Sequence, residues 1–372
     1  MAVQDYALLV GISRYKDGKQ FPPLDGPLND VERVRDWLMD KVHGQAVPID
    51  HITTLTTPDD LLKPPLAGWP PKTVWAPNRD GFSKMFNDIA FDNEGKMLRR
   101  EGRLYLYFSG HGFSLNEDDS PSAALFSADN IGLIHSNLAG TIYAAAVKRA
   151  KLFREVVLIM DCCRDVFGNL AYNAPDFNRV ENTSSDTVKL YALYAAPRRG
   201  KSQERELPDS GGKVVGLMTD AMLRALKEAP SDVSGQVAGR VLTQVMTYNW
   251  ADWYQVRPMP PAPRGVPPDE GDIYFNSRQD DLVPVTVSIS KPLVLSSKFE
   301  LRSDAWTAVA TVKESSLRWR EKGYGWLQEI ALRQPSETSQ QFTMVLPPGP
   351  HLLCIGADTY SFDPGASNVV AI

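Results

Sequence analysis

Over about two thirds of the chain, short apolar runs alternate with stretches in which apolar residues recur at helical spacing. The apolar runs predict strands of a sheet that is covered on both faces, at residues 6–12, 49–55, 103–108, 155–160 and 188–195. The amphipathic stretches predict helices at residues 29–42, 80–91, 138–153, 215–227 and 237–248. For the first helix, Asn29 or Asp30 is a suitable N-cap. This alternation favours an α/β fold with a largely parallel sheet.

The pattern changes near residue 255, where six prolines fall between positions 258 and 268. Such crowding is typical of a stiff, extended linker. Beyond it the helical period disappears, and short strand-like segments follow one another, with Pro347-Pro348-Gly349 as a turn between two of them. We therefore predict an α/β domain at 1–254, a proline-rich linker at 255–283 and a small, all-β immunoglobulin-like sandwich at 284–372.

Composition and charge exclude several classes of protein. The 372 residues are 43% hydrophobic and 23% charged, which is ordinary for a soluble globular protein. Lys and Arg number 40 against 45 Asp and Glu, for a net charge of −5, so we expect neither a nucleic-acid partner nor a membrane surface. No apolar run approaches the roughly 18 residues of a membrane span. The first residues show neither a basic n-region nor a cleavage site, so we do not expect secretion. A cytoplasmic location is the expectation.

The cysteines point in the same direction. Cys162, Cys163 and Cys354 are odd in number, and two of them are adjacent, which does not fit a disulfide framework. Adjacent cysteines also make a poor zinc clamp, because tetrahedral ligation needs spaced pairs. We expect a reducing compartment, no metal site built on these cysteines and no organic cofactor.

Two reactive side chains each follow a predicted buried strand: His111 after residues 103–108 and Cys163 after residues 155–160. If these strands are parallel neighbours, both side chains lie at one edge of the sheet, where α/β folds place their sites. A thiol beside an imidazole is the minimum for nucleophilic catalysis, and the amides of Gly112 and Cys163 are candidate oxyanion donors. Taken singly, a histidine at a strand end is most often structural and a cysteine a small buried hydrophobe. Their joint placement favours a function.

The motifs around these residues resemble those of a known family. Tyr107–Gly112 (YFSGHG) resembles the Y-x-S-G-H-G block of metacaspases and other caspase-like cysteine peptidases. Asp161–Arg164 (DCCR) resembles their D-S-C-H or D-C-C-R block and the A-C-R of caspases. Ala7–Ile12, Asp25–Asp30 and Gly212–Leu226 are similar to three further blocks in the family's order. The resemblance covers roughly residues 5–250.

The resemblance implies a reaction and a specificity. Cys163 takes the place of the nucleophile and His111 that of the general acid/base, which leaves Cys162 buried and passive. Metacaspases build their S1 pocket from acidic residues at the positions of Asp30 and Asp161 and a serine at that of Ser109. Two carboxylates suit a guanidinium or ammonium group, so the resemblance implies cleavage of proteins after Arg, then Lys. Asp30 as a helix cap and Asp161 as a strand-end turn residue stay open as alternatives.

Some positions depart from the family pattern. Arg164 replaces the metacaspase histidine, Asp165 stands where a small residue is common, and Val215-Gly216-Leu217 lacks the usual aromatic residue. Many members bind calcium, but no D-x-D-x-D ligand set is present, so calcium stays open. The basic loop near Arg199 and Arg205 is either a solvated surface loop or a site of self-cleavage.

A rival interpretation keeps the fold without the chemistry. In it, the chain is a catalytically silent or latent caspase-like scaffold that binds a protein partner through its C-terminal β domain. The presence of both dyad residues, each with glycines or charges beside it, argues against this. We further expect activation by self-cleavage or by a partner, a role in a bacterial signalling or defence pathway, and a monomeric state.

Overall fold

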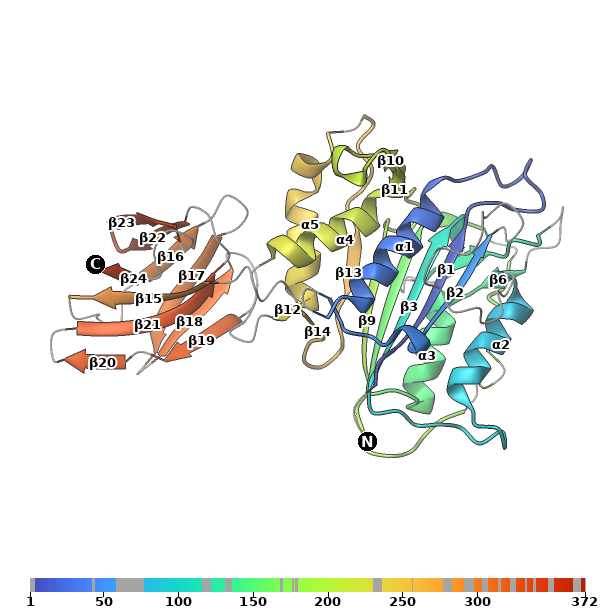
Figure 1. The fold of residues 1–372 in the computed structure, drawn as a ribbon, viewed down its shortest axis with the longest axis horizontal. Helices are drawn as coiled ribbons and strands as arrows, with labels where there is room; N and C mark the ends of the chain where they lie inside the picture. The colour runs from blue at the N-terminus through green and yellow to red at the C-terminus, as the bar shows by residue number, and fades with distance from the viewer. Residues whose placement is uncertain are drawn as a thin grey trace. The chain divides into compact units, whose positions relative to one another are not determined.

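The apolar runs of the sequence form a six-stranded sheet in the order β13-β9-β7-β3-β1-β2 (Figure 1). Its strands are β1 (Tyr6–Ile12), β2 (Ile52–Thr57), β3 (Arg103–Gly110), β7 (Glu155–Cys162), β9 (Lys189–Tyr194) and β13 (Arg264–Val266). The pairs from β9 to β2 are parallel, and β13 runs antiparallel to β9. The predicted α/β class with a mostly parallel sheet is therefore confirmed.

The structure is a computed structural model. It describes residues 4–41, 44–57, 77–115, 122–130, 136–167, 170–175, 177, 180–229, 236–255, 257–276, 283–290, 298–302, 307–313, 316–321, 326–331, 333–336, 339–346, 351–363 and 369–371. Contacts divide the chain into two units, one of Met1–Arg224 with Met246–Ile273 and one of Ala225–Val245 with Tyr274–Ile372. Within the described part, no helix is long and apolar enough to cross a membrane.

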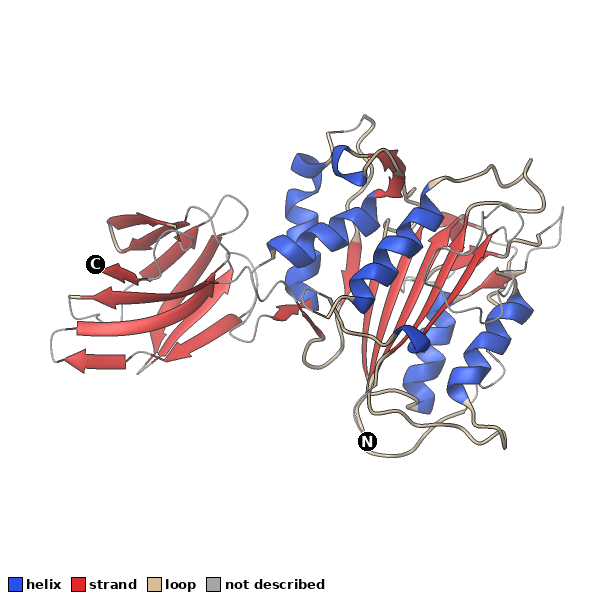
Figure 2. Cartoon of the chain, viewed as in Figure 1, coloured by secondary structure: helices blue, strands red, loops and turns tan. Residues whose placement is uncertain are grey.

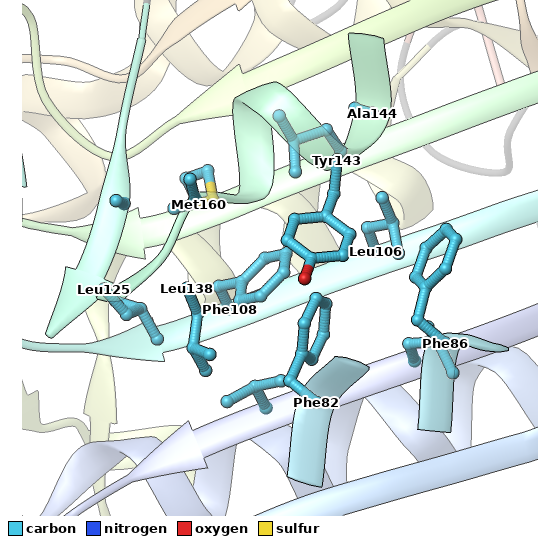
Figure 3. Packing of buried hydrophobic residues seen from close by; sticks show 14 of the residues in the cluster. Phe82, Phe86, Leu106, Phe108, Leu125, Leu138, Tyr143, Ala144 and Met160 are labelled. Carbon is cyan, nitrogen blue, oxygen red and sulfur yellow. The ribbon is translucent and has the colours of Figure 1, made fainter. Parts of the chain in front are cut away.

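The described residues also form α-helices, which are blue in Figure 2: α1 (Gly26–Met39), α2 (Arg79–Ala90), α3 (Gly140–Ala150), α4 (Leu217–Glu228) and α5 (Gly239–Trp253). Successive side chains of β3 point to opposite faces of the sheet, as in any strand. On one face, Phe108 lies against Phe82 of α2, whose ring meets Tyr143 of α3 at 4.7 Å (Figure 3). On the other, Tyr105 packs edge-on to Trp37 of α1. The sheet is thus covered on both faces.

Helix α1 begins at Gly26, three residues before the predicted start, and its N-cap position is Asp25. Pro27 stands in the first turn, where its missing N–H removes no helical hydrogen bond, so the helix includes it. The interpretation of Asn29 or Asp30 as N-cap is therefore wrong. Asp30 instead lies inside the helix, one turn from its start, and is buried against the sheet.

Other boundaries also moved. Strands β3 and β7 continue two residues beyond the predicted ends, to Gly110 and Cys162. The basic loop that was predicted near Arg199 and Arg205 contains strand β10 (Glu204–Glu206), which pairs antiparallel with β11 (Val214–Gly216). Short strands also precede two helices, β6 (Asn137–Leu138) before α3 and β12 (Gln236–Ala238) before α5. Strands of two or three residues are too short for a hydrophobic pattern to separate them from the helix that follows.

Part of the predicted linker joins the main sheet. Arg264–Val266, the three residues between Pro263 and Pro267, pair with Ala192–Tyr194 as edge strand β13. An edge position suits this sequence, because prolines on either side cannot donate to a ladder and are tolerated at the rim of a sheet. Farther on, β14 (Tyr274–Asn276) pairs with β12.

A small second sheet continues the chain beyond the ends of β3 and β7. Its order is β6-β5-β4-β8, with β4 (Gly112–Ser114), β5 (Ala124–Phe126) and β8 (Asp165–Val166). Strands β4 and β8 are parallel, with Phe113 beside Asp165. The segments that follow His111 and Cys163 in the chain are therefore paired with each other as neighbouring strands.

The C-terminal residues form two sheets around one apolar cluster. The first, β20-β21-β15-β24, contains β15 (Val283–Ile289), β20 (Arg333–Ser336), β21 (Ser339–Leu346) and β24 (Val369–Ala371). The second, β19-β18-β17-β16-β22-β23, contains β16 (Lys298–Arg302), β17 (Thr307–Lys313), β18 (Ser316–Glu321), β19 (Trp326–Ala331), β22 (His351–Ile355) and β23 (Asp358–Phe362). Val287 and Phe342 from the first meet Phe299 and Leu353 from the second. The predicted turn Pro347–Gly349 lies outside the described residues.

Candidate active site

The structure brings the two reactive side chains to one edge of the sheet. Strands β3 and β7 are parallel neighbours, and their last paired residues are Gly110 and Cys162. His111 and Cys163 are the next residue on each strand, so they leave the sheet side by side. The sequence analysis assumed that these two strands are parallel neighbours, and the structure confirms it.

The two adjacent cysteines differ in access. Cys162 is the last residue of β7 and is 1% exposed, whereas Cys163 is half-buried. Burial raises the pKa of both thiols, and that of Cys162 lies well above its ordinary value. Cys163 is therefore the thiol that a substrate can reach. Cys162, as expected, is packed in the core.

The ring of His111 is held in one tautomer. Its Nε2 lies 2.8 Å from the main-chain oxygen of Pro22. A carbonyl oxygen can only accept, so Nε2 carries the proton and donates it. In the neutral imidazole Nδ1 is then the free base. Pro22 escaped the sequence analysis because a main-chain carbonyl leaves no mark on residue type.

The thiol of Cys163 is also engaged with the main chain. Its Sγ donates to the oxygen of Ser202 at 3.7 Å. Among the hydrogen bonds of the described residues, none joins His111 to Cys163. In this structure His111 therefore contacts the carbonyl of Pro22, and Cys163 contacts the carbonyl of Ser202.

Gly112 permits the close approach of the two strand ends. A Cβ on this residue would stand 2.5 Å from Sγ of Cys162 and 2.9 Å from the main-chain oxygen of Cys163. Only glycine fits there without a shift of the backbone that carries Cys162 and Cys163. The amides of Gly112 and Cys163, the predicted oxyanion donors, belong to these same two segments.

Two buried carboxylates converge beside the thiol and imidazole. Asp30 is 1% exposed and Asp161 5% exposed, and Gly216 lies between them. A Cβ on Gly216 would collide with Oδ2 of Asp161 and stand 2.8 Å from Oδ2 of Asp30. The predicted third member, Ser109, donates to Asp30 Oδ2 at 3.2 Å. The structure therefore brings all three predicted pocket residues together.

Donors from the chain itself satisfy both carboxylates. Asp30 Oδ1 accepts from the amide of Gly216 at 2.8 Å. Asp161 accepts from Ser202 Oγ at 2.8 Å and from Thr219, through both its amide (3.1 Å) and its hydroxyl (2.7 Å). Burial raises the pKa of both carboxyls, and the charge of Asp161 raises that of Asp30 further. Because Asp161 receives more hydrogen bonds, the pKa of Asp30 is the one that is raised further above its ordinary value.

The segment Lys201–Glu206 connects the thiol, the carboxylates and helix α1. Ser202 contacts both Cys163 and Asp161, as described above. Two residues later, the carboxylate of Glu204 accepts from the first amides of α1, those of Asp25 (3.0 Å) and Gly26 (2.8 Å). The unpaired amides and dipole of a helix N-terminus favour such an anion. Sequence reasoning missed Ser202 and Glu204 because their partners lie far away in the chain.

Arg164, the departure from the metacaspase pattern, directly follows Cys163 and is fully buried. Its guanidinium donates to the main-chain oxygens of Ser122 (3.0 Å) and Ala196 (3.3 Å). Its main chain exchanges two 2.9 Å hydrogen bonds with the next loop, from its amide to Gly200 and from the amide of Arg199 to its oxygen. Arg164 thus joins the segment that contains Cys162 and Cys163 to the loop after β9 by hydrogen bonds.

The two candidate cleavage sites differ in structure. Arg199 is exposed in a turn, with a left-handed φ of +64°. Arg205 is also exposed but lies in β10, paired with Val215 of β11. Within the described residues, no cluster of three or more His, Cys, Asp or Glu side chains could hold a metal ion.

The comparisons with known proteins agree with this geometry. A family model for the caspase domain matches residues 4–248, more than half of the chain. No curated protein matches the chain. The matched residues include both strand ends, the two carboxylates and the segment that joins them. The chain therefore belongs to the caspase-domain family, a family of cysteine peptidases.

Proposed function

We propose that this chain is a metacaspase-like cysteine endopeptidase that cleaves proteins after Arg, and less readily after Lys, with Cys163 as nucleophile and His111 as acid/base. The observation that carries the proposal is the placement of a half-buried thiol and a tautomerically fixed imidazole on adjacent ends of parallel strands. The family match supplies the reaction class.

The proposed reaction starts when the thiol turns from the Ser202 carbonyl toward Nδ1 of His111. Nδ1 accepts the proton, and the thiolate attacks the scissile carbonyl carbon, forming a C–S bond. The amides of Gly112 and Cys163 donate to the resulting oxyanion. The imidazolium then protonates the leaving amine as the C–N bond breaks. Water, deprotonated by His111, hydrolyses the acyl-enzyme and releases the thiol.

Specificity for a basic P1 side chain is supported by the charge of the pocket. Asp30 and Asp161 supply two carboxylates beside the nucleophile, and an arginine fork matches such acceptors. A P1 guanidinium bonds Asp161 Oδ1, which in this structure accepts from Ser202 Oγ. Segment 201–206 therefore has to shift for the substrate to enter. For this reason a latent enzyme, which needs a partner, cleavage or calcium to move that segment, is the second candidate.

We also propose that the two C-terminal sheets form an immunoglobulin-like sandwich that binds a protein partner. Their shared apolar cluster supports a sandwich. The partner itself is inferred by analogy with other peptidases that carry such domains. We further propose a cytoplasmic location.

Matched fluorogenic peptides with Arg, Lys or Asp at P1, assayed with and without calcium, test the proposed activity. We expect Arg to be cleaved fastest, Lys more slowly and Asp not at all. Cys163→Ala abolishes turnover, because the adjacent thiol of Cys162 is buried in the core. Cys162→Ala is the matched control and retains it. Hydrolysis that survives in Cys163→Ala, or a preference for Asp, would overturn the proposal.

A further inference from the structure

The loop between β1 and α1, residues 13–25, holds His111 at two points. One is the hydrogen bond from Nε2 to the Pro22 carbonyl. The other is Tyr15, and we propose that Tyr15 is a positioning residue, which sets the place of the His111 main chain and ring relative to Cys163. This inference rests on the proposed function, since it concerns the same dyad.

Tyr15 contacts His111 through both its hydroxyl and its ring. The hydroxyl accepts from the main-chain N–H of His111 at 2.7 Å, and the ring centroids lie 5.2 Å apart. Tyr15 is 8% exposed, and burial raises the pKa of its phenol well above the ordinary value. The hydroxyl therefore stays neutral at physiological pH and remains a fixed partner of the amide.

The strand leaves room for this contact at Gly110. A Cβ there would stand 2.8 Å from the Tyr15 hydroxyl, and the φ of +153° is one that residues with a side chain rarely adopt. The turn from β3 into His111 is thus built around the hydroxyl. Any larger residue at Gly110 has to push Tyr15 away.

The loop itself is anchored, so the position of Tyr15 is well defined. Its ends are joined by a hydrogen bond from the amide of Leu24 to the oxygen of Ser13, at 2.9 Å. Phe21 packs between Tyr15 (5.2 Å) and Phe126 of the small sheet (4.7 Å). Tyr15 and the Pro22 carbonyl are therefore carried by one fastened piece of chain.

Removal of the hydroxyl leaves the His111 amide without its partner, and the main chain moves to find another. A displacement of about 1 Å in a catalytic group costs on the order of 100-fold in rate. For Tyr15→Phe we therefore expect kcat to fall by about 10- to 100-fold. We expect little change in KM, because Tyr15 contacts none of the pocket residues in the described structure.

The test compares Tyr15→Phe with Tyr105→Phe. Tyr105 is an equally buried tyrosine at the opposite end of β3, where its hydroxyl bonds Gln45 and Arg103. The readouts are kcat, KM, melting temperature and the pH dependence of Cys163 alkylation by iodoacetamide, located by tandem mass spectrometry. We expect Tyr15→Phe to shift the alkylation profile toward that of His111→Ala, and Tyr105→Phe to leave it as in wild type.

Alkylation separates this inference from the proposed activity, because it needs no peptide hydrolysis. Wild-type kcat and alkylation profile in Tyr15→Phe would overturn the positioning role and leave the peptidase proposal standing. A wild type that cleaves no peptide refutes the proposed activity, while a changed profile in Tyr15→Phe still supports the inference. An unchanged profile in His111→Ala overturns the inference as well.

Should Tyr15→Phe fold poorly, Gly110→Ala displaces the same hydroxyl from the other side and is expected to shift the profile in the same direction.

Discussion

At the scale of single residues, the site is governed by two carboxyls that share one buried space. Burial raises the pKa of both Asp30 and Asp161, and the charge of Asp161 raises that of Asp30 further. The chain offsets this cost with donors from Gly216, Thr219 and Ser202. As the pH falls, Asp30 is the first of the two to take up a proton, which removes the remaining repulsion.

The raised pKa of Asp30 has a consequence for stability. The folded state holds this proton more tightly than the unfolded chain, in which the carboxyl titrates near its ordinary value of about 4. The contribution to the free energy of unfolding is therefore present below pH 4 and is lost as the pH rises through the folded pKa, by up to about 1.4 kcal/mol per pH unit. The Asp30→Asn substitution removes this dependence of the free energy of unfolding on pH.

Urea unfolding between pH 4 and 7 measures the effect as the difference between Asp30→Asn and wild type. We expect the variant to gain relative to wild type as the pH rises. Asp80→Asn, in the exposed first turn of α2, is the control and should run parallel to wild type. A difference that is independent of pH would show that Asp30 is ionised throughout.

At the scale of elements, strand β10 is fastened to helix α1 across the site. Glu204 occupies the N-terminus of α1, and its neighbour Gln203 accepts from the amide of Leu217, at the start of α4. Opposite it, β11 is joined to α1 by the hydrogen bond from Asn29 Nδ2 to the oxygen of Val214. The hairpin that covers the carboxylates is thus held on both strands.

We expect Glu204→Ala to destabilise the protein by about 1–2 kcal/mol, because two charge-assisted hydrogen bonds to the helix N-terminus are lost. The freed hairpin also loosens the position of Ser202 above Asp161, so KM for P1-Arg peptides changes as well. Denaturant unfolding and steady-state kinetics measure both effects. Glu206→Ala, an exposed residue of the same strand, is the control. Equal stability of the two variants would argue against the role of Glu204.

At the scale of the whole molecule, the segments on either side of the basic loop share one fold. Strand β9 precedes the loop, and β13, far beyond it, pairs with β9 in the main sheet. Arg33 of α1 forms an ion pair at 2.6 Å with Asp220 of α4. A break in the loop therefore leaves these interactions in place.

We expect prolonged incubation of active protein to cut the chain after Arg199, whose turn is exposed, before Arg205, whose main chain is paired in a ladder. The fragments should separate under denaturing conditions and stay together in gel filtration. Mass spectrometry identifies the sites, with Cys163→Ala as the uncut control. A wild-type chain whose mass stays intact would exclude self-cleavage.

Much of the sheet could be predicted from the sequence alone. The run Tyr6–Ile12 forms β1 with the predicted limits, because a continuous apolar stretch of that length has few alternatives to a buried strand. His111 and Cys163 were found for a related reason, since each directly follows such a strand. The start of α1 was misplaced because Pro27 looks like a loop residue in sequence, although it is accepted in a first turn.

Residue type and order thus determined the α/β class, the two strand ends and the choice of reactive side chains. The tertiary structure decided everything that depends on distant segments. Examples are the Pro22 carbonyl on His111, the Ser202 contacts with Cys163 and Asp161, and Glu204 on α1. These are single hydrogen bonds, several of them to main-chain atoms, between residues far apart in the chain. They leave no periodicity or spacing in the sequence, so only the folded chain reveals them.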